Sequence, residues 1–250
     1  ALMFVYYLIT RWKELGKING KEYIVKTIVT TETIKTIAER NGVEMYDVYT
    51  GFKWIANVMR ENEGKKNYIG GGEESYGFLC EDFVRDKDAV SACVILAEIA
   101  AWAKDQGLSL YQLLQKIYVE YGFSKEKGIS VVKKGKSGAE EIEAMMKKFR
   151  ENPLTEIAGS KVTYFYDYST LKGKDYAENE TVTLDMPTTS NVLQYFTEDN
   201  TKVSIRPSGT EPKIKFYCEV HSKVKSIDEL PEAEKAAEEK INQIKASLGI

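Results

Sequence analysis

The sequence predicts two successive domains: an α/β domain with a mixed or parallel sheet that is incomplete at its N-terminus, then a smaller α+β domain. Helical and strand-like segments alternate through the first 120 residues, which is typical of a parallel sheet. From about Gly122 the sequence becomes charged and punctuated by glycine. A chain of 250 residues with 43% hydrophobic residues can form one large or two ordinary domains. We therefore assign residues 1–122 to the first domain and 123–250 to the second.

The first domain is expected to begin with a helix whose apolar run from Ala1 to Ile9 is too short to span a bilayer. No positive charge precedes that run, so it does not resemble a signal peptide. We interpret it as a core helix of a domain that starts further upstream. The expected elements are helices at 2–15, 32–40, 52–60, 88–104 and 109–121, and strands at 23–29, 43–48 and 68–69. The alanine-rich helix 88–104 is expected to be buried on most sides.

The second domain is expected to combine two amphipathic helices with antiparallel strands. Its helices are expected at 137–150 and 230–248, and its strands at 161–168, 192–197, 201–205 and 213–220. The polar segment 172–180 is interpreted as an exposed loop.

Composition excludes several classes of function. With 35 basic and 38 acidic residues, the net charge of −3 gives no reason to expect a nucleic-acid partner. The three cysteines, at 80, 93 and 218, are too few and scattered for a disulfide framework, so we expect a reducing, cytoplasmic setting. The single histidine, His221, excludes a Ser/His/Asp triad and a histidine-rich metal site.

Residues 70–77, Gly-Gly-Gly-Glu-Glu-Ser-Tyr-Gly, carry groups suited to a polyol. Glycines let the backbone approach a ligand closely, while the carboxylates of Glu73 and Glu74 and the hydroxyl of Ser75 can bond adjacent sugar hydroxyls. A flexible surface turn with incidental acids is the alternative. The expected position of this segment at a strand end in an α/β sheet favours a ligand loop.

Residues 206–212, Arg-Pro-Ser-Gly-Thr-Glu-Pro, form a compact set of hydrogen-bond donors between two expected strands. Those donors are Arg206, Ser208, Gly209 and Thr210. A guanidinium, hydroxyls and an open glycine amide suit a phosphate dianion. Strand alternation places Lys213 and Lys215 on one face, where they add positive charge if that face points toward the loop. A hairpin turn with a surface arginine is the alternative.

Two shorter motifs give weaker signals. Thr50-Gly51, at a strand-to-helix junction, exposes backbone amides near a helix N-terminus, although a simple helix cap explains Thr50 equally well. Residues 85–88, Arg-Asp-Lys-Asp, precede the alanine-rich helix, and a solvated surface with Asp88 as a cap is the alternative there.

Four of these motifs, at 50–55, 72–75, 85–88 and 206–213, resemble in order and separation the phosphoglucomutase/phosphomannomutase family of α-D-phosphohexomutases. The family has four domains around a deep cleft, so the resemblance implies most of the third domain and the whole fourth. It also implies a reaction in which a phosphoserine of the first domain passes its phosphoryl group to a hexose monophosphate. The bisphosphate so formed reorients and returns the other phosphate.

The resemblance implies a role for each matching residue. The residues expected to contact the sugar are Thr50, Gly51, Glu73 and Ser75. The residues expected to contact the non-reacting phosphate are Arg206, Ser208, Gly209, Thr210 and Lys215. Lys87 is the candidate catalytic residue, near the transferring phosphoryl group. Gly77 stands where some family members have a histidine, which moves the candidate acid/base role to Lys87.

The 250 residues contain neither the serine nucleophile loop nor the acidic metal loop of the family. The expected Mg²⁺ would therefore be held outside this chain, with hexose 1,6-bisphosphate as intermediate, and the chain alone should not turn over. The expected partners are a hexose phosphate and the N-terminal domains of the same polypeptide, and neither nucleic acid nor membrane. The alternatives are a phosphopentomutase of the same family and a non-catalytic sugar-phosphate-binding module.

Overall fold

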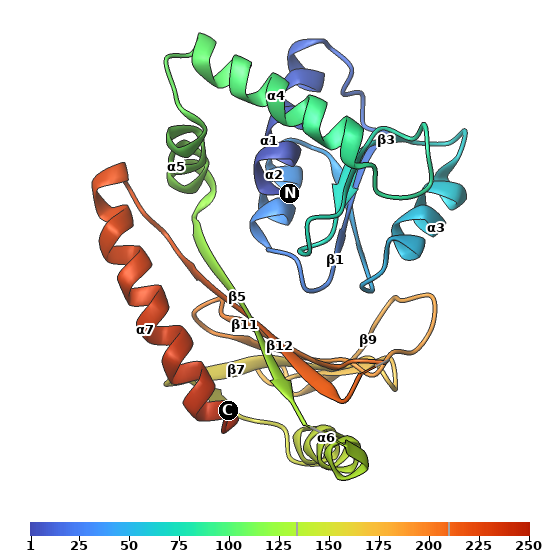
Figure 1. Cartoon of the computed structure of the whole chain (residues 1–250), viewed down its shortest axis with the longest axis vertical. Helices are drawn as coiled ribbons and strands as arrows, with labels where there is room; N and C mark the ends of the chain where they lie inside the picture. Colours follow the sequence, from blue (N-terminus) through green and yellow to red (C-terminus); the bar gives the residue numbers. More distant parts are fainter. Residues whose placement is uncertain (134, 210) are drawn as a thin grey trace. The chain divides into compact units, whose positions relative to one another are not determined.

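The computed structural model describes residues 1–133, 135–209 and 211–250 (Figure 1). It divides into two compact units. The first comprises Ala1–Phe123 with Lys223–Ile227, and the second comprises Ser124–Ser222 with Asp228–Ile250.

The first unit is built on a mixed sheet with the strand order β2-β1-β3-β4. Strand β1 pairs in parallel with β2 and β3, and β4 pairs antiparallel with β3. The strands are β1 Glu22–Thr27, β2 Glu44–Val48, β3 Asn67–Gly72 and β4 Phe78–Cys80, and the helices are α1 Leu2–Glu14, α2 Thr33–Arg40, α3 Phe52–Asn62, α4 Ala89–Asp105 and α5 Leu110–Tyr121. The predicted α/β class with a mixed sheet is confirmed.

Helices cover both faces of this sheet, so the central strand is buried on both sides. All residues of β1 are buried, and Ile24 packs into a core formed with α1, α2, α4 and α5. Its neighbours Tyr23 and Val25 point the other way, into a second core against α3. The alternation of successive strand side chains accounts for this division.

The prediction that helix α4 is buried on most sides was wrong. Only Ile99 and Ala103 of this helix are buried, whereas Val90 is 73% and Val94 61% exposed. The helix contacts the core along one stripe, next to α1 and β4. High alanine and aliphatic content does not reveal which stripe of a helix is covered.

The second unit is an antiparallel sheet with two long helices, which confirms the predicted α+β class. The strand order is β5-β12-β11-β10-β7-β8-β9, with β6 paired to β7. The strands are β5 Phe123–Val132, β6 Glu156–Ile157, β7 Ser160–Asp167, β8 Lys172–Asp175, β9 Glu180–Thr183, β10 Leu193–Thr197, β11 Lys202–Pro207 and β12 Lys213–Ser222. The helices are α6 Gly135–Glu151 and α7 Leu230–Leu248, with a 3₁₀ turn at Ile227–Glu229.

One face of the second sheet supplies the core of this unit. The hydroxyl of Tyr195 donates to the carbonyl of Phe149 in α6 at 3.0 Å, and Phe149 lies against Phe216 of β12. The buried members of this face are Phe165, Leu193, Tyr195, Val203, Ile205, Phe216 and Cys218. The alternate residues of the same strands form the opposite face, which carries the phosphate candidates described below.

Two elements of the second unit differ from the prediction. The segment expected to be a loop at 172–180 contains β8 and the start of β9, which form a hairpin. Gly173 pairs with Tyr166, and the Tyr166 ring lies over the glycine. A Cβ on Gly173 would lie only 2.4 Å from Cδ1 of Tyr166. Strand β5 was missed because it lies at the edge of the sheet. Its first two residues are buried and the rest are mostly exposed, so much of its sequence is polar.

Candidate functional site

The first cluster of candidate residues lies at the carboxyl edge of the first sheet. Since β1, β2 and β3 are parallel, the segments that follow them emerge at the same edge. The N–H of Gly51, after β2, donates to Oε1 of Glu73, after β3, at 2.7 Å. Gly51 has φ +114°, which only glycine adopts easily, and it caps α3 without any side-chain hydrogen bond. The structure thus brings Gly51 and Glu73 together, and Thr50 immediately precedes Gly51 in the chain.

The glycines that precede Glu73 are required by the packing of the sheet itself. Gly70 to Gly72 lie within β3. A Cβ on Gly71 would lie 2.2 Å from the carbonyl oxygen of Val25 in β1, and one on Gly72 would lie 2.4 Å from the carbonyl oxygen of Gly77. The glycines permit close approach of neighbouring backbone, and the loop itself is the tip of the β3–β4 hairpin, residues 73–77.

The acids of this hairpin tip are not incidental. Glu73 is bonded to Gly51, and Oε2 of Glu74 accepts from the hydroxyl of Thr27 at the end of β1, at 3.2 Å. Between these anchors and Gly77, Ser75 and Tyr76 are exposed, with Tyr76 in the left-handed region at φ 66°. The hairpin tip is therefore held in place by the hydrogen bonds of Glu73 and Glu74, whereas Ser75 is exposed to solvent.

Lys87 lies beside the same hairpin tip. The position of a Cβ on Gly77 would be 3.0 Å from Cδ of Lys87 and 3.2 Å from Oε2 of Glu73. Nζ of Lys87 lies 3.1 Å from Oδ1 of Asp86 and 5.8 Å from the ring centre of Phe52, the first residue of α3. The structure thus gathers Gly51, Glu73 and Lys87 around Gly77.

The neighbouring Asp88 caps helix α4, which confirms the structural alternative for that residue. Its Oδ2 accepts from the N–H of Ser91 at 2.7 Å. Hydrogen bonds from the hydroxyl and from the N–H of Ser91 lower the pKa of Asp88 below its ordinary value. Asp88 fixes the start of α4, immediately after Lys87.

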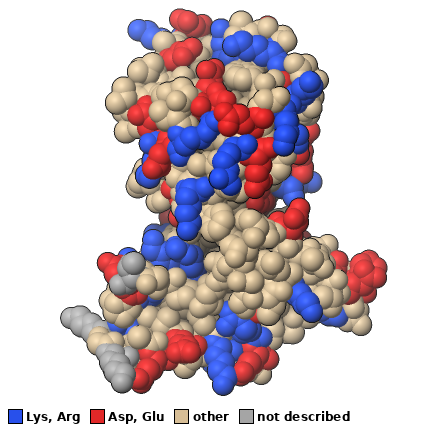
Figure 2. Space-filling view, turned by 90° about the vertical axis from the view of Figure 1, so that its right-hand side faces the viewer, with Lys and Arg blue, Asp and Glu red and all other residues tan. Residues whose placement is uncertain are grey.

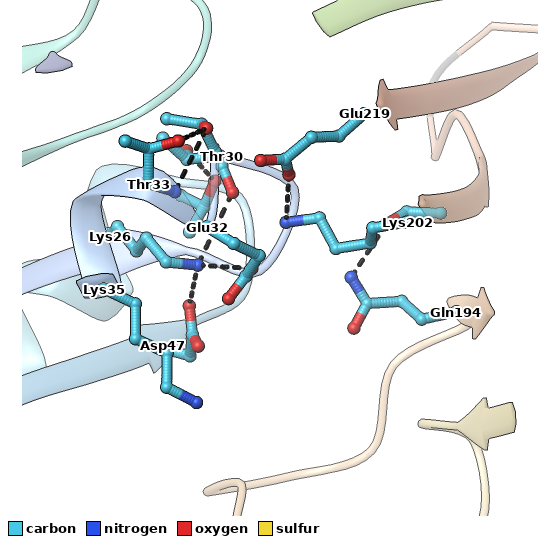
Figure 3. A network of polar contacts seen from close by, with 12 residues as sticks. Lys26, Thr30, Glu32, Thr33, Lys35, Asp47, Gln194, Lys202 and Glu219 are labelled. Carbon is cyan, nitrogen blue, oxygen red and sulfur yellow. Dashed lines mark hydrogen bonds and ion pairs between the residues drawn. The ribbon is translucent and has the colours of Figure 1, made fainter. Parts of the chain in front are cut away.

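Sequence reasoning missed a buried lysine at the same edge of the sheet (Figure 3). Nζ of Lys26 donates to Oδ1 of Asp47 at 2.7 Å and to Oε1 of Glu32 at 3.0 Å, and lies 3.5 Å from the carbonyl oxygen of Thr30. The Lys26 side chain is 1% exposed, so burial alone would lower its pKa, but the carboxylates of Asp47 and Glu32 outweigh burial and raise it. The signal was a lysine directly after the apolar residues Tyr23 to Val25 of a central strand, and a buried lysine requires a counter-charge.

The second cluster lies on the face of the second sheet opposite the apolar core of that unit. Arg206 of β11 is the direct cross-strand partner of Lys215 of β12. The N–H of Ser208 donates to the carbonyl of Lys213 at 2.8 Å, so Lys213 and Lys215 share the face of Arg206. The predicted alignment of these charges is confirmed, although Lys213 also pairs with Glu211. The interaction with Lys213 lowers the pKa of the exposed Glu211.

The turn beyond this pair is partly described. Gly209 is exposed, and among the described residues other than its chain neighbours no atom lies within 4 Å of the position its Cβ would take. Thr210, the remaining phosphate candidate, lies outside the described residues.

Buried hydrogen bonds support the strand that carries Arg206. The hydroxyl of Tyr168 donates to Oε1 of Gln194 at 2.6 Å, and Nε2 of Gln194 donates to Oγ of Ser204 at 2.8 Å. On the same face, Lys202 and Glu219 form a buried ion pair at 3.0 Å (Figure 3). One residue separates Ser204 from Arg206, so both side chains lie on one face of β11.

Charges of both signs are distributed over both units on the surface seen in Figure 2. Among the described residues, no group of three histidine, cysteine, aspartate or glutamate side chains could hold a metal ion. The cysteines at 80, 93 and 218 are free. No helix within the described ranges is long and apolar enough to cross a membrane.

Comparison with known proteins identifies the family to which these two domains belong. The model for "Phosphoglucomutase/phosphomannomutase, alpha/beta/alpha domain III" matches residues 3–121, and the model for the C-terminal domain of the same family matches residues 130–237. The chain belongs to the phosphoglucomutase/phosphomannomutase family. The predicted resemblance to the C-terminal half of these proteins is confirmed.

Two curated phosphoglucomutases illustrate the relation to the family. The protein of Staphylococcus haemolyticus (strain JCSC1435) is 35% identical over 221 residues, which cover 88% of this chain and 39% of that protein. The protein of Staphylococcus aureus (strain bovine RF122 / ET3-1) is 40% identical over 194 residues, which cover 78% of this chain and 35% of that protein. The chain thus spans less than half the length of these relatives.

Solved structures of the family share the fold. A Paramecium phosphoglucomutase, pp63/parafusin, superposes with a TM-score of 0.58 at 18% identity, over 96% of this chain and 41% of that one. A family protein from Burkholderia thailandensis gives 0.56 at 15% identity, over 99% and 41%.

Proposed function

We propose that this chain recognises the substrate in a phosphohexomutase, and that the polypeptide containing it moves a phosphoryl group between the 1- and 6-positions of a hexose phosphate. The observation that carries the proposal is the convergence of Gly51, Glu73 and Lys87 around Gly77 at the carboxyl edge of a sheet. Ligands of open α/β sheets bind at such edges. Curated relatives of the chain are named phosphoglucomutases.

In this proposal Glu73 recognises sugar hydroxyls. Its Oε1 is bonded to the Gly51 amide, which fixes the carboxylate and leaves further lone pairs of both oxygens for ligand hydroxyls. The exposed hydroxyl of Ser75 adds a donor and an acceptor, and Thr50 and Gly51 line the same edge. Because a carboxylate accepts from any suitably placed hydroxyl, it can serve a sugar bound in either of two orientations.

Lys87 serves as the charged group of this cluster. Its ammonium would stabilise negative charge on a transferring phosphoryl group or assist proton transfer. Phosphoryl transfer depends mainly on positioning and charge stabilisation, so the contribution of Lys87 would depend on the position of its ammonium.

The second unit would hold the phosphate that does not react. Arg206 and Lys215 are cross-strand neighbours, and the turn at 208–209 leaves Gly209 uncrowded. A guanidinium, an ammonium and open backbone amides together bind a phosphate dianion. Ser208, Gly209 and Thr210 complete the proposed phosphate group.

A phosphoserine and Mg²⁺ complete the reaction in this proposal, both supplied by N-terminal domains of the same polypeptide. The described residues of this chain do not fit a metal ion, since they contain no suitable group of ligands. We therefore assign Mg²⁺ no step here, and take hexose 1,6-bisphosphate as the intermediate. We further propose a cytoplasmic location.

The experiment is a mutase assay of the full-length protein on glucose 1-phosphate, mannose 1-phosphate and ribose 1-phosphate. Turnover of a hexose phosphate supports the proposal. Turnover of ribose 1-phosphate alone would favour a phosphopentomutase, and binding without any turnover would favour a non-catalytic sugar-phosphate-binding module. Isolated residues 1–250 should bind substrate without turnover.

Two variants test the assigned contacts by calorimetric titration. Arg206→Ala should weaken glucose 6-phosphate binding by roughly 1.5–3 kcal/mol, the typical contribution of a charged hydrogen bond. Arg60→Ala, which removes an exposed arginine of α3, is the control and should leave affinity unchanged. Glu73→Gln should weaken binding of the sugar phosphate more than binding of inorganic phosphate. Equal losses for the two ligands would refute the sugar contact.

A further inference from the structure

Residue 77 is a buried glycine whose side-chain space is occupied by two residues of the proposed site. A Cβ there would lie 3.0 Å from Cδ and 3.7 Å from Cβ of Lys87, and 3.2 Å from Oε2 of Glu73. Contacts of 3.0–3.4 Å are tighter than nearly all contacts that real Cβ atoms make. Gly77 is not among the residues with positive φ, so backbone geometry does not require glycine. The requirement is steric and comes from Lys87 and Glu73.

The backbone at this position is held by hydrogen bonds on both sides of the hairpin. The carbonyl of Gly77 accepts from the N–H of Glu73 at 2.8 Å and leaves no room for a Cβ on Gly72. The next residue, Phe78, pairs with Gly72 in the β3–β4 ladder. A side chain at 77 would therefore have to displace Lys87 or Glu73.

Lys87 is the partner that would move. Glu73 is held by the Gly51 amide at 2.7 Å, whereas the Lys87 side chain is 53% exposed and its charged contact is to the exposed Asp86. The stem of Lys87 lies along Gly77, which points its ammonium toward the ring of Phe52. The conformation of Lys87 thus depends on residue 77 being a glycine, which has no side chain.

We propose that Gly77 is a positioning residue for Lys87: the absence of a side chain at 77 admits the lysine stem and directs its ammonium toward the ring of Phe52. A side chain at 77 would require the stem of Lys87 to shift by a few tenths of an ångström. The inference rests on the proposed function, because it concerns how the proposed charged group is held for phosphoryl transfer.

The kinetic test uses the full-length protein with glucose 1-phosphate as substrate. Gly77→Ala should lower kcat on the order of tenfold, because misplacement of a reacting group by a fraction of an ångström is costly, and should change KM by less than about twofold. In a Lys87→Ala background, where the 3.0 Å contact is absent, the same substitution should change kcat by less than about twofold. Equal losses in both backgrounds would overturn the proposal.

Gly128→Ala is the matched control, because Gly128 lies in β5 with ordinary φ and nothing within 4 Å of its Cβ position. It should leave kcat unchanged in both backgrounds. If Gly77→Ala proves too unstable to assay, the double variant with Lys87→Ala decides. Removing the lysine stem should restore folding, and failure to restore it would contradict the proposed contact.

A second measurement does not depend on turnover. Nζ of Lys87 lies 5.8 Å from the ring centre of Phe52, so the terminal methylene protons of Lys87 should show ring-current shifts in carbon–proton NMR spectra of residues 1–250. Gly77→Ala should move these signals toward free-lysine positions, whereas Gly128→Ala should not. Unchanged Lys87 signals would refute the inference even in an active enzyme. Inactivity of the wild type toward every sugar phosphate would instead refute the proposed function and leave this readout intact.

Discussion

Replacement of Lys26 by methionine should destabilise the first unit by about 2–3 kcal/mol. Lys26 is 1% exposed and pairs with Asp47 at 2.7 Å and Glu32 at 3.0 Å. Removing one partner of a buried ion pair costs roughly 3–5 kcal/mol. The two carboxylates are about one-third exposed, at 34% and 33%, and water would recover part of that loss. Methionine keeps the length of the apolar stem, so the charge is the principal change.

Tryptophan fluorescence in a urea titration measures this effect selectively. The tryptophans Trp12, Trp54 and Trp102 all lie in the first unit, so their emission reports its unfolding. Lys35→Met is the control, because Lys35 is 48% exposed in its side chain and its contact with Glu39 is 3.9 Å long. Surface pairs of this kind contribute at most about 1 kcal/mol. A loss for Lys26→Met no greater than for Lys35→Met would refute the reasoning.

The pH dependence gives an independent check. The net effect of the surroundings raises the pKa of Lys26 in the folded state. Stability from a raised lysine pKa is complete below the unfolded value, about 10.4, and is lost only as pH rises beyond it. The difference between wild type and Lys26→Met should therefore stay constant between about pH 6 and 9. A difference that changed markedly within that window would indicate another titrating group.

Two further predictions concern the same sheet. The carboxylate of Glu22 accepts from the N–H of Asn19 at 2.8 Å, and although burial raises its pKa, this and neighbouring hydrogen bonds hold the pKa below its usual value. Glu22→Gln should therefore cost about 1.5–3 kcal/mol at pH 7 and little at pH 3, measured by urea titration, since stability from a lowered carboxylate pKa disappears as pH falls. Gly71→Ala should abolish folding of the first unit or destabilise it by at least about 3 kcal/mol by circular dichroism, because its Cβ would lie 2.2 Å from the carbonyl oxygen of Val25. Near-normal stability of Gly71→Ala, comparable to that of Gly128→Ala, would contradict the described strand packing.

The fold could be predicted wherever the local pattern and the tertiary context agree. Strand β1 contains the apolar residues Tyr23 to Val25, and helix α7 repeats its buried positions at helical spacing. The errors fall where context overrides pattern. Strand β5 is largely polar because it lies at a sheet edge, and in the β8–β9 hairpin the ring of Tyr166 packs against Gly173, which offers no apolar side chain to the pattern.

The candidate site was predictable residue by residue but not contact by contact. The sequence indicates Glu73 and Thr50-Gly51 separately, and their contact depends on the parallel pairing of β1 with β2 and β3. The partners of Lys26 lie 6 and 21 residues away, so spacing along the chain gives no indication of that network. The steric role of Gly77 requires the path of the chain through Lys87, which no local pattern encodes.

The groups proposed to meet substrate are therefore fixed by hydrogen bonds and close packing at the sheet edge. Glu73 is oriented by the Gly51 amide, its neighbour Glu74 is bonded to Thr27, and in our proposal Lys87 is positioned by the space at Gly77. Such fixing matters most in a reaction that depends on positioning, because a carboxylate or ammonium that is already placed requires no reorganisation as charge develops. It follows that substitutions which loosen these contacts should lower kcat more than they weaken binding. A loss confined to KM in such variants would show that the edge only binds substrate.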